Sequence, residues 1–102
     1  MAATDPIVVE VDRDLRDVVH LYLESRGADF ARLDQACHSG DFDEVRRIGH
    51  KLRGSSGGLG FAEAGQIGAT LEKAASANDA AKVAAGIRSL REYFARVSIR
   101  YV

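Results

Sequence analysis

The sequence predicts an all-α fold, an antiparallel up-down-up-down bundle of four helices. Apolar residues recur at helical spacing, short polar or glycine-containing stretches separate the periodic segments, and the single proline, Pro6, precedes all of them. The chain has 102 residues, of which 46% are hydrophobic and 28% charged. This size and composition predict one domain over residues 1–102. The four expected helices cover about residues 12–38, 41–57, 61–77 and 79–97.

The first helix is expected to begin after Asp12, which is a good N-cap residue, and to end near His38. Gly27 interrupts it at a cost of about 1 kcal/mol relative to alanine. Because the apolar stripe keeps its phase across Gly27, we expect one long helix rather than two. The stripe consists of Leu15, Val18, Val19, Tyr22, Leu23, Phe30, Leu33 and Cys37.

The second helix is expected to follow Ser39-Gly40, with Asp41 as N-cap and Glu44 three residues later, in the order of a capping box. Gly57-Gly58-Leu59-Gly60 ends it, and Asn78-Asp79 separates the third helix from the fourth. The apolar stripes of these helices are, in order, Val45, Ile48, Leu52 and Leu59; Phe61, Ala64, Ile67, Leu71 and Ala75; and Val83, Ile87, Leu90, Phe94 and Val97.

Several side chains are assigned to the interior or its edge from these stripes. We expect Phe30, Phe61, Phe94 and Cys37 in the core, and Tyr22 with its hydroxyl at the edge. Ser55 and Ser56 are expected to be small packing residues rather than nucleophiles. Gly49, Gly65 and Gly68 are positions where the second and third helices could pack closely.

The two ends of the chain, Ile7–Val11 and Val97–Val102, are rich in β-branched residues and read as extended. In an up-down-up-down bundle they leave the helices at the same end. They could therefore pair as a small ribbon, and two frayed termini are the equally weighted alternative.

Composition excludes several classes of protein. The formal net charge of −1 argues against a nucleic-acid binder, and no apolar run approaches the ~18 residues that would span a membrane. A lone cysteine, Cys37, excludes an internal disulfide, and the N-terminus lacks the pattern of a secretion signal, so we expect a cytoplasmic protein, monomeric in solution. His20 and His38 are about 27 Å apart along one helix and cannot share a metal ion, so no metal site is expected.

His50 is the candidate functional residue. On a helical projection it points about 175° away from the centre of the second helix's apolar stripe, and therefore toward solvent. Arg46, Arg47, Arg53 and Gly54 lie on neighbouring turns of the same face. Such cations repel a metal ion, but they suit nucleophilic attack of a neutral imidazole on phosphorus, because they stabilise phosphoryl oxygens.

The stretch His50-Lys51-Leu52-Arg53-Gly54-Ser55-Ser56-Gly57-Gly58-Leu59-Gly60 resembles the signature of histidine-containing phosphotransfer (HPt) domains. Gly40-Asp41-Phe42 and Leu71-Glu72 also look like this family. The resemblance implies that His50 is the phosphoacceptor, that Arg53 steadies the phosphoryl group and that Gly54 keeps the surface open. Some members carry a glutamine on the next helix that bonds the other ring nitrogen. Glu72 occupies that position here, and either supports Nδ1 or is simply solvated.

The resemblance further implies a phosphocarrier without an ATP site or cofactor of its own. Its partners would be a sensor or hybrid histidine kinase and a response-regulator receiver domain, with Mg²⁺ on the receiver only. The residues expected to contact such a partner are Arg46, Arg47, Lys51 and Gly57, and the three cations could equally form an ordinary charged helix face. The alternative function is a non-phosphorylated interaction module that regulates a partner by docking, and a helical metal or ligand carrier is a weaker third.

Overall fold

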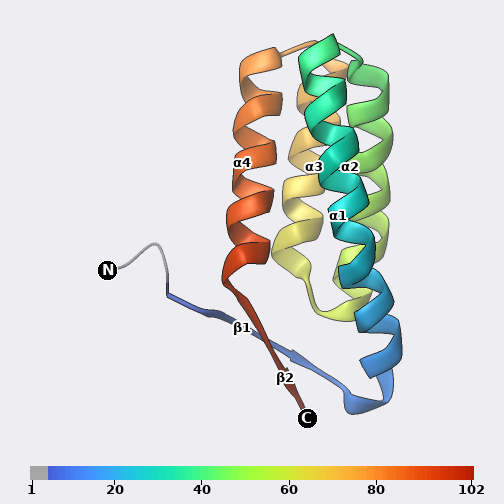
Figure 1. The fold of residues 1–102 in the computed structure, drawn as a ribbon, viewed down its shortest axis with the longest axis vertical. Coiled ribbons are helices and arrows are strands. Elements are labelled where there is room, and N and C mark those ends of the chain that lie inside the picture. Colours follow the sequence, from blue (N-terminus) through green and yellow to red (C-terminus); the bar gives the residue numbers. More distant parts are fainter. Residues whose placement is uncertain (1–4) are drawn as a thin grey trace.

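Residues 5–102, which the computed structural model describes, form four helices and a small two-stranded sheet (Figure 1). Residues 1–4, which begin the expected domain and the N-terminal stretch without a secretion-signal pattern, lie outside the described residues. Successive helices run in opposite directions, and the predicted all-α four-helix fold is confirmed. In chain order the elements are β1 (Ile7–Val11), η1 (Arg13–Leu15), α1 (Arg16–Ser39), α2 (Phe42–Ser56), η2 (Gly57–Leu59), α3 (Ala62–Ser76), α4 (Ala80–Arg96) and β2 (Val97–Tyr101).

Helix α1 is the longest of the four and runs unbroken through Gly27, as the continuous apolar stripe predicts. It begins later than expected, because Asp12 caps the short 3-10 turn η1 by accepting a hydrogen bond from the Asp14 amide. Val18, which belongs to the apolar stripe in the sequence, is 48% exposed. Arg26 and Asp29 are buried on this helix instead, a feature that an apolar stripe does not reveal.

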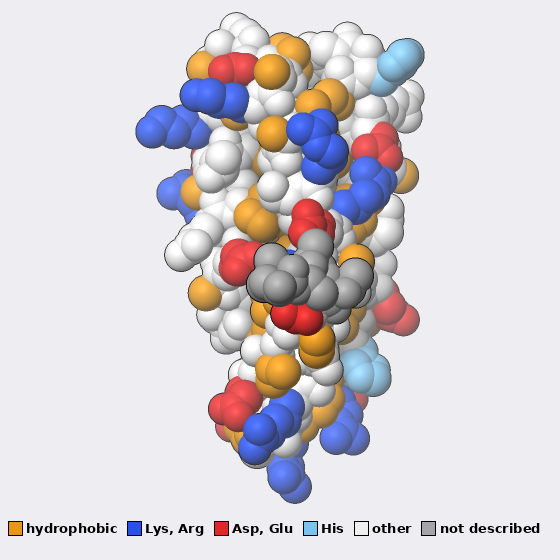
Figure 2. All heavy atoms as spheres, turned by 90° about the vertical axis from the view of Figure 1, so that its left-hand side faces the viewer, with side chains coloured by type: hydrophobic (Ala, Val, Ile, Leu, Met, Phe, Trp, Pro, Cys, Tyr) orange, Lys and Arg blue, Asp and Glu red, His pale blue; other side chains and the backbone are white. Residues whose placement is uncertain are grey.

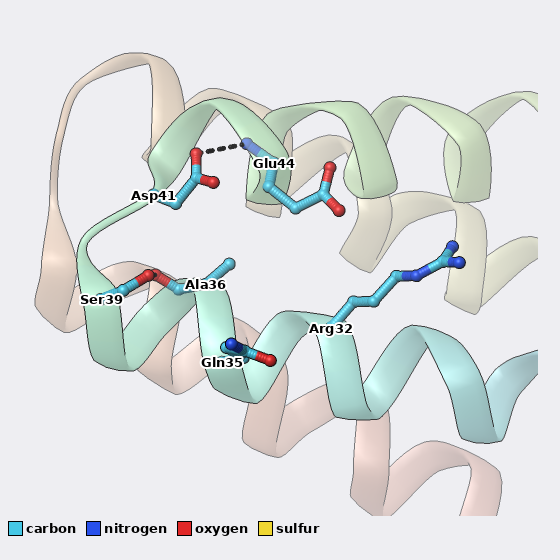
Figure 3. A pocket seen from close by; sticks show the side chains of 6 residues that line it. All are labelled: Arg32, Gln35, Ala36, Ser39, Asp41 and Glu44. Atoms are coloured by element: carbon cyan, nitrogen blue, oxygen red, sulfur yellow. Dashed lines mark hydrogen bonds between the residues drawn. The ribbon is translucent and has the colours of Figure 1, made fainter.

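The turn between α1 and α2 is stabilised by a left-handed glycine and by an N-cap. Gly40 has φ +74°, a left-handed conformation that favours glycine, and Asp41 accepts a hydrogen bond from the Glu44 amide (Figure 3). The other half of the expected capping box does not form, because the Asp41 amide donates to the Ala36 carbonyl and Glu44 pairs with Arg47. Figure 3 shows the shallow cavity of about 170 Å³ that remains between the two helices at this end.

Helices α2 and α3 touch through their backbones at Gly49 and Gly68. A Cβ atom on Gly49 would lie 2.6 Å from the Gly68 carbonyl oxygen, and one on Gly68 would lie 2.7 Å from the Gly49 carbonyl oxygen. Both distances are too short for any side chain. The predicted close packing of these two helices is therefore confirmed, and it sets Glu72 of α3 directly beside α2.

Aromatic side chains fill the centre of the bundle. The rings of Tyr22 and Phe61 stack with centroids 4.8 Å apart, and Phe61 is fully buried, whereas Phe30 and Phe94 are half-buried against the core. The expectation that the Tyr22 hydroxyl lies at the edge is wrong. This hydroxyl is buried and shares a 2.6 Å hydrogen bond with Ser56 Oγ, which satisfies two polar groups at once. Cys37 is only half-buried.

The two terminal segments pair as a ribbon, so the alternative of frayed termini is wrong. Strands β1 and β2 are parallel, with Ile7 opposite Val97 and Val11 opposite Tyr101. The strands are parallel because both cross the same end of the bundle in one direction, from the side of α4 toward the start of α1 (Figure 1). The side chains of Val9 and Val11 in β1 are buried in the core, and the Arg16 guanidinium lies 4.6 Å from the centroid of the Tyr101 ring.

On the face that includes α4, basic and acidic side chains alternate with small hydrophobic patches (Figure 2). This mixture agrees with a net charge of −1. Within residues 5–102, no helix combines the length and the apolar character needed to cross a membrane.

Two glycine-to-alanine substitutions should have opposite effects on stability. Gly68→Ala places a Cβ 2.7–2.9 Å from the Gly49 oxygen, the Leu52 Cβ and the Arg53 amide, so α2 and α3 must separate. We expect a loss of about 1–3 kcal/mol in the free energy of unfolding. Gly27→Ala meets no atom within 4 Å and should add about 0.5–1 kcal/mol. Urea unfolding measures both, and a Gly68→Ala variant as stable as the parent would contradict the backbone contact.

Candidate functional site

His50 lies on the outward face of α2, as predicted. Its side chain is 63% exposed, whereas Gly49 and Leu52 on the same helix are buried. The apolar stripe of α2 packs into the bundle and leaves the imidazole on the opposite side. Open solvent therefore borders the ring, and another protein can reach it.

Two side chains contact the same ring nitrogen of His50. Nδ1 lies 3.0 Å from Glu72 Oε2 and 3.0 Å from Arg53 Nη2. Glu72 and Arg53 also contact each other, with Arg53 Nε 3.0 Å from Glu72 Oε1. The three residues, from α2 and α3, form a cluster that we call the His50 triad. Glu72 is the least exposed of the three, at 24%.

The triad favours one tautomer of the ring. A carboxylate can only accept a hydrogen bond and a guanidinium can only donate one, so Nδ1 cannot bond to both at once. When Nδ1–H donates to Glu72, Arg53 remains bonded to the second carboxylate oxygen and its charge offsets that of Glu72. Nε2 then carries the lone pair of the ring, in a side chain that is 63% exposed.

The other cations predicted around His50 have partners of their own. Arg46 Nη2 lies 2.7 Å from Asp43 Oδ1, and this hydrogen bond is the main cause of the lowered pKa of Asp43. Arg47 pairs in the same way with Glu44, at 2.7 Å. Both are exposed pairs within one helix, which contribute little to stability and can exchange partners.

Lys51 turns away from His50. Its Nζ lies 3.0 Å from Asp29 Oδ1 on α1, so its charge serves the α1–α2 contact. Gly54 and Gly57 are exposed, and a Cβ at either position would meet no atom within 4 Å. The surface that follows His50 on α2 is therefore bare backbone, as the sequence predicted for Gly54 and Gly57.

A buried charged pair beneath α2 was not predicted from the sequence. Arg26 and Asp29 are 7% and 2% exposed, and Arg26 Nη2 lies 3.2 Å from Asp29 Oδ2. The Arg26 guanidinium also lies 4.3 Å from the centroid of the Tyr22 ring, while its Nε and Nη1 have no hydrogen-bond partner. Tyr22, Arg26, Asp29 and Leu33 follow each other at spacings of four, three and four, and this periodicity was the available signal.

Among residues 5–102, no three His, Cys, Asp or Glu side chains are grouped so that they could hold a metal ion. The cavity in Figure 3 lies nearer the start of α2, and its lining residues, Arg32 to Glu44, do not include the His50 triad. This cavity therefore lies apart from His50, whose side chain is exposed on the surface of α2.

Comparison with known protein families places this fold in one of them. The model of a family described as "Hpt domain" matches residues 17–98, from the second residue of α1 to the second residue of β2. A search of curated proteins and a search of solved structures found no significant match.

The buried pair beneath α2 should be sensitive to loss of its carboxylate. Asp29→Ala leaves the Arg26 guanidinium buried without its counter-charge, and we expect a loss of about 3–5 kcal/mol in the free energy of unfolding. The control is Asp34→Ala on the same helix, which breaks an exposed pair with Arg91 and should cost within about 1 kcal/mol. If urea unfolding gives equal losses in the free energy of unfolding for Asp29→Ala and Asp34→Ala, the buried pair is no more important for stability than the exposed one.

Proposed function

The chain belongs to the Hpt domain family of phosphotransfer modules, and on that premise we propose that it is a phosphorelay intermediate that carries a phosphoryl group on His50. It would accept the group from a sensor or hybrid histidine kinase, or from a receiver domain, and pass it to or from the aspartate of a response-regulator receiver. The observation that carries this proposal is the His50 triad, in which Nδ1 is occupied and Nε2 is free.

The proposed reaction uses few groups of this chain. The Nε2 lone pair attacks phosphorus while the bond to the donor's oxygen or nitrogen breaks and its electron pair leaves with the donor. Glu72 holds the Nδ1 proton and orients the ring. Arg53, 52% exposed and beside the ring, can turn its remaining N–H groups to the phosphoryl oxygens. Phosphoryl transfer requires mainly such positioning and charge stabilisation.

In this proposal the partner receiver would supply the acidic residues and the metal ion for transfer. A receiver's carboxylates and Mg²⁺ would approach over Gly54 and Gly57, where no side chain obstructs them. Arg46 and Arg47 can leave their exposed intrahelical pairs to meet that acidic surface, and Lys51 stays nearer to Asp29. We propose that residues 1–102 act in this way as one domain, a cytoplasmic monomer without a cofactor of its own.

Incubation with a phosphorylated receiver domain tests the function. We expect phosphate on this chain that is acid-labile and alkali-stable, and that is absent from His50→Gln. His20→Gln, which removes an exposed histidine of α1, is the matched control and should label normally. A native chain that binds the receiver but takes up no phosphate would instead indicate a docking module, and would contradict the proposal.

Arg53→Ala tests the role of the guanidinium in transfer. Loss of one or two charge-assisted hydrogen bonds to the phosphoryl group should raise the barrier by about 1.5–3 kcal/mol, and so slow transfer about tenfold or more. Rapid-quench measurement with a receiver domain gives this rate. Arg88→Ala, an exposed arginine of α4, should leave the rate unchanged. A rate for Arg53→Ala equal to that of Arg88→Ala would remove Arg53 from the proposed mechanism.

A further inference from the structure

A second cavity lies between α1 and α4, in the half of the bundle opposite the terminal ribbon (Figure 1). Its volume is about 330 Å³, at the lower end of the range of ~300–1,000 Å³ found for ligand sites. The residues that line it recur at helical spacing, within 34–38 on α1 and within 84–91 on α4. The cavity is therefore part of a groove that runs along two helices.

The floor of this groove is apolar and incompletely covered. Cys37 continues the apolar stripe of α1 but is only half-buried, and it lines the cavity together with the buried Ile87 of α4. Ala84, one turn before Ile87, has only a methyl side chain and leaves the space open. Closer to the ribbon, Phe30 and Phe94 close the same interface edge to face, with ring centroids 6.3 Å apart. An apolar side chain from outside would gain at Cys37 the contacts that α1 and α4 do not give each other.

The rim of the groove is basic. Among the described residues that line the cavity, Asp34 alone is acidic, and its two carboxylate oxygens accept hydrogen bonds from Arg91 at 3.0 and 2.6 Å. Arg88, one turn earlier on α4, is exposed and forms no hydrogen bond or ion pair with any residue in 5–102. His38 adds an exposed imidazole on the side of α1. The positive charge of Arg88 thus lies beside an apolar floor without a counter-charge.

We propose that this groove binds an acidic amphipathic helix of a partner protein. The lining positions follow i, i+3 and i+4 on α1 and i, i+3, i+4 and i+7 on α4, and an open groove of this form suits a third helix. An aliphatic side chain of that helix enters the cavity over Cys37 and Ile87, and a carboxylate on a neighbouring turn pairs with Arg88. This docking goes beyond the phosphotransfer proposed for His50 and does not depend on it.

The groove and the His50 triad lie on different helices. Helix α1 turns Asp29 toward Lys51 of α2, and it turns Asp34 toward Arg91 of α4. The triad belongs to α2 and α3, and none of its members lines the cavity. A helix in the groove therefore leaves His50 accessible, so one protein can hold the domain while another approaches the histidine.

Two synthetic helical peptides test the proposal on the whole chain. One peptide has leucines along one face with glutamates beside them, and the other has lysines in place of the glutamates. Cys37 is the only cysteine of the chain, and a leucine seated over it should slow the reaction of its thiol with a disulfide reagent. We expect the glutamate peptide to protect Cys37 and to shift the NMR signals of residues 34–38 and 84–91, but not those of His50. The lysine peptide should do neither.

Three variants locate the binding, which fluorescence anisotropy of the labelled peptide measures. Arg88→Glu replaces an attraction by a repulsion and should weaken binding of the glutamate peptide about three- to tenfold. Lys82→Glu makes the same change in net charge elsewhere on α4, at a residue that lines a different cavity, and should leave the affinity unchanged. Ala84→Phe places a ring in the cavity and should prevent binding.

Several results would overturn the proposal. If neither peptide protects Cys37, the groove is not a docking surface, and if both protect it equally, the groove does not select an acidic partner. Equal protection by inorganic phosphate alone would make it a site for small anions rather than for a helix. Circular dichroism identifies a variant that fails to fold, and the comparison of the two peptides on the native chain then still decides.

Discussion

The backbone contact between Gly49 and Gly68 is the constraint on which the site depends. It brings α2 and α3 so close that no side chain fits between them at this level, and the next turn of α3 carries Glu72. Because α2 and α3 are this close, the Glu72 carboxylate on α3 reaches the His50 imidazole on α2, at 3.0 Å from Nδ1. The chemistry on the outer face of α2 is thus set by a contact in which neither partner has a side chain.

Local pairing then decides which of the cations on α2 is available at His50. Arg46 and Arg47 each have an acidic residue three positions earlier on the same helix, and Lys51 is drawn to the buried Asp29 of α1. Arg53 differs because its partner, Glu72, also contacts the ring. The basic face that the sequence places on this helix is therefore divided in the structure into two exposed pairs within the helix, a lysine that contacts α1 and one arginine beside His50.

The periodicity of the sequence predicted those features that depend on the residues of a single helix. The four helices, the outward position of His50 and the role of the small residues at Gly49 and Gly68 all follow from spacing and from the cost of glycine in a helix. The burial of Arg26 and Asp29, the exposure of Val18 and the turning of Lys51 depend on what a neighbouring helix presents. A stripe defined by apolar residues skips Arg26 and Asp29 although they are in phase with Tyr22 and Leu33. The Glu72 contact likewise needs the distance between α2 and α3, which spacing within each helix does not contain.

The imidazole of His50 is contacted by other side chains at Nδ1, and most of its side chain is exposed. At Nδ1 the chain supplies an acceptor, a compensating cation and a rigid helix contact, so little is left for a partner to arrange. Further along the chain, Gly54 and Gly57 supply exposed backbone without side chains, at a cost in helix stability of about 0.5–1 kcal/mol for each glycine within a helix. In the proposed phosphorelay role this division would be useful, because the ring would stay oriented while each partner brought its own acidic residues and metal ion to the exposed side of the ring.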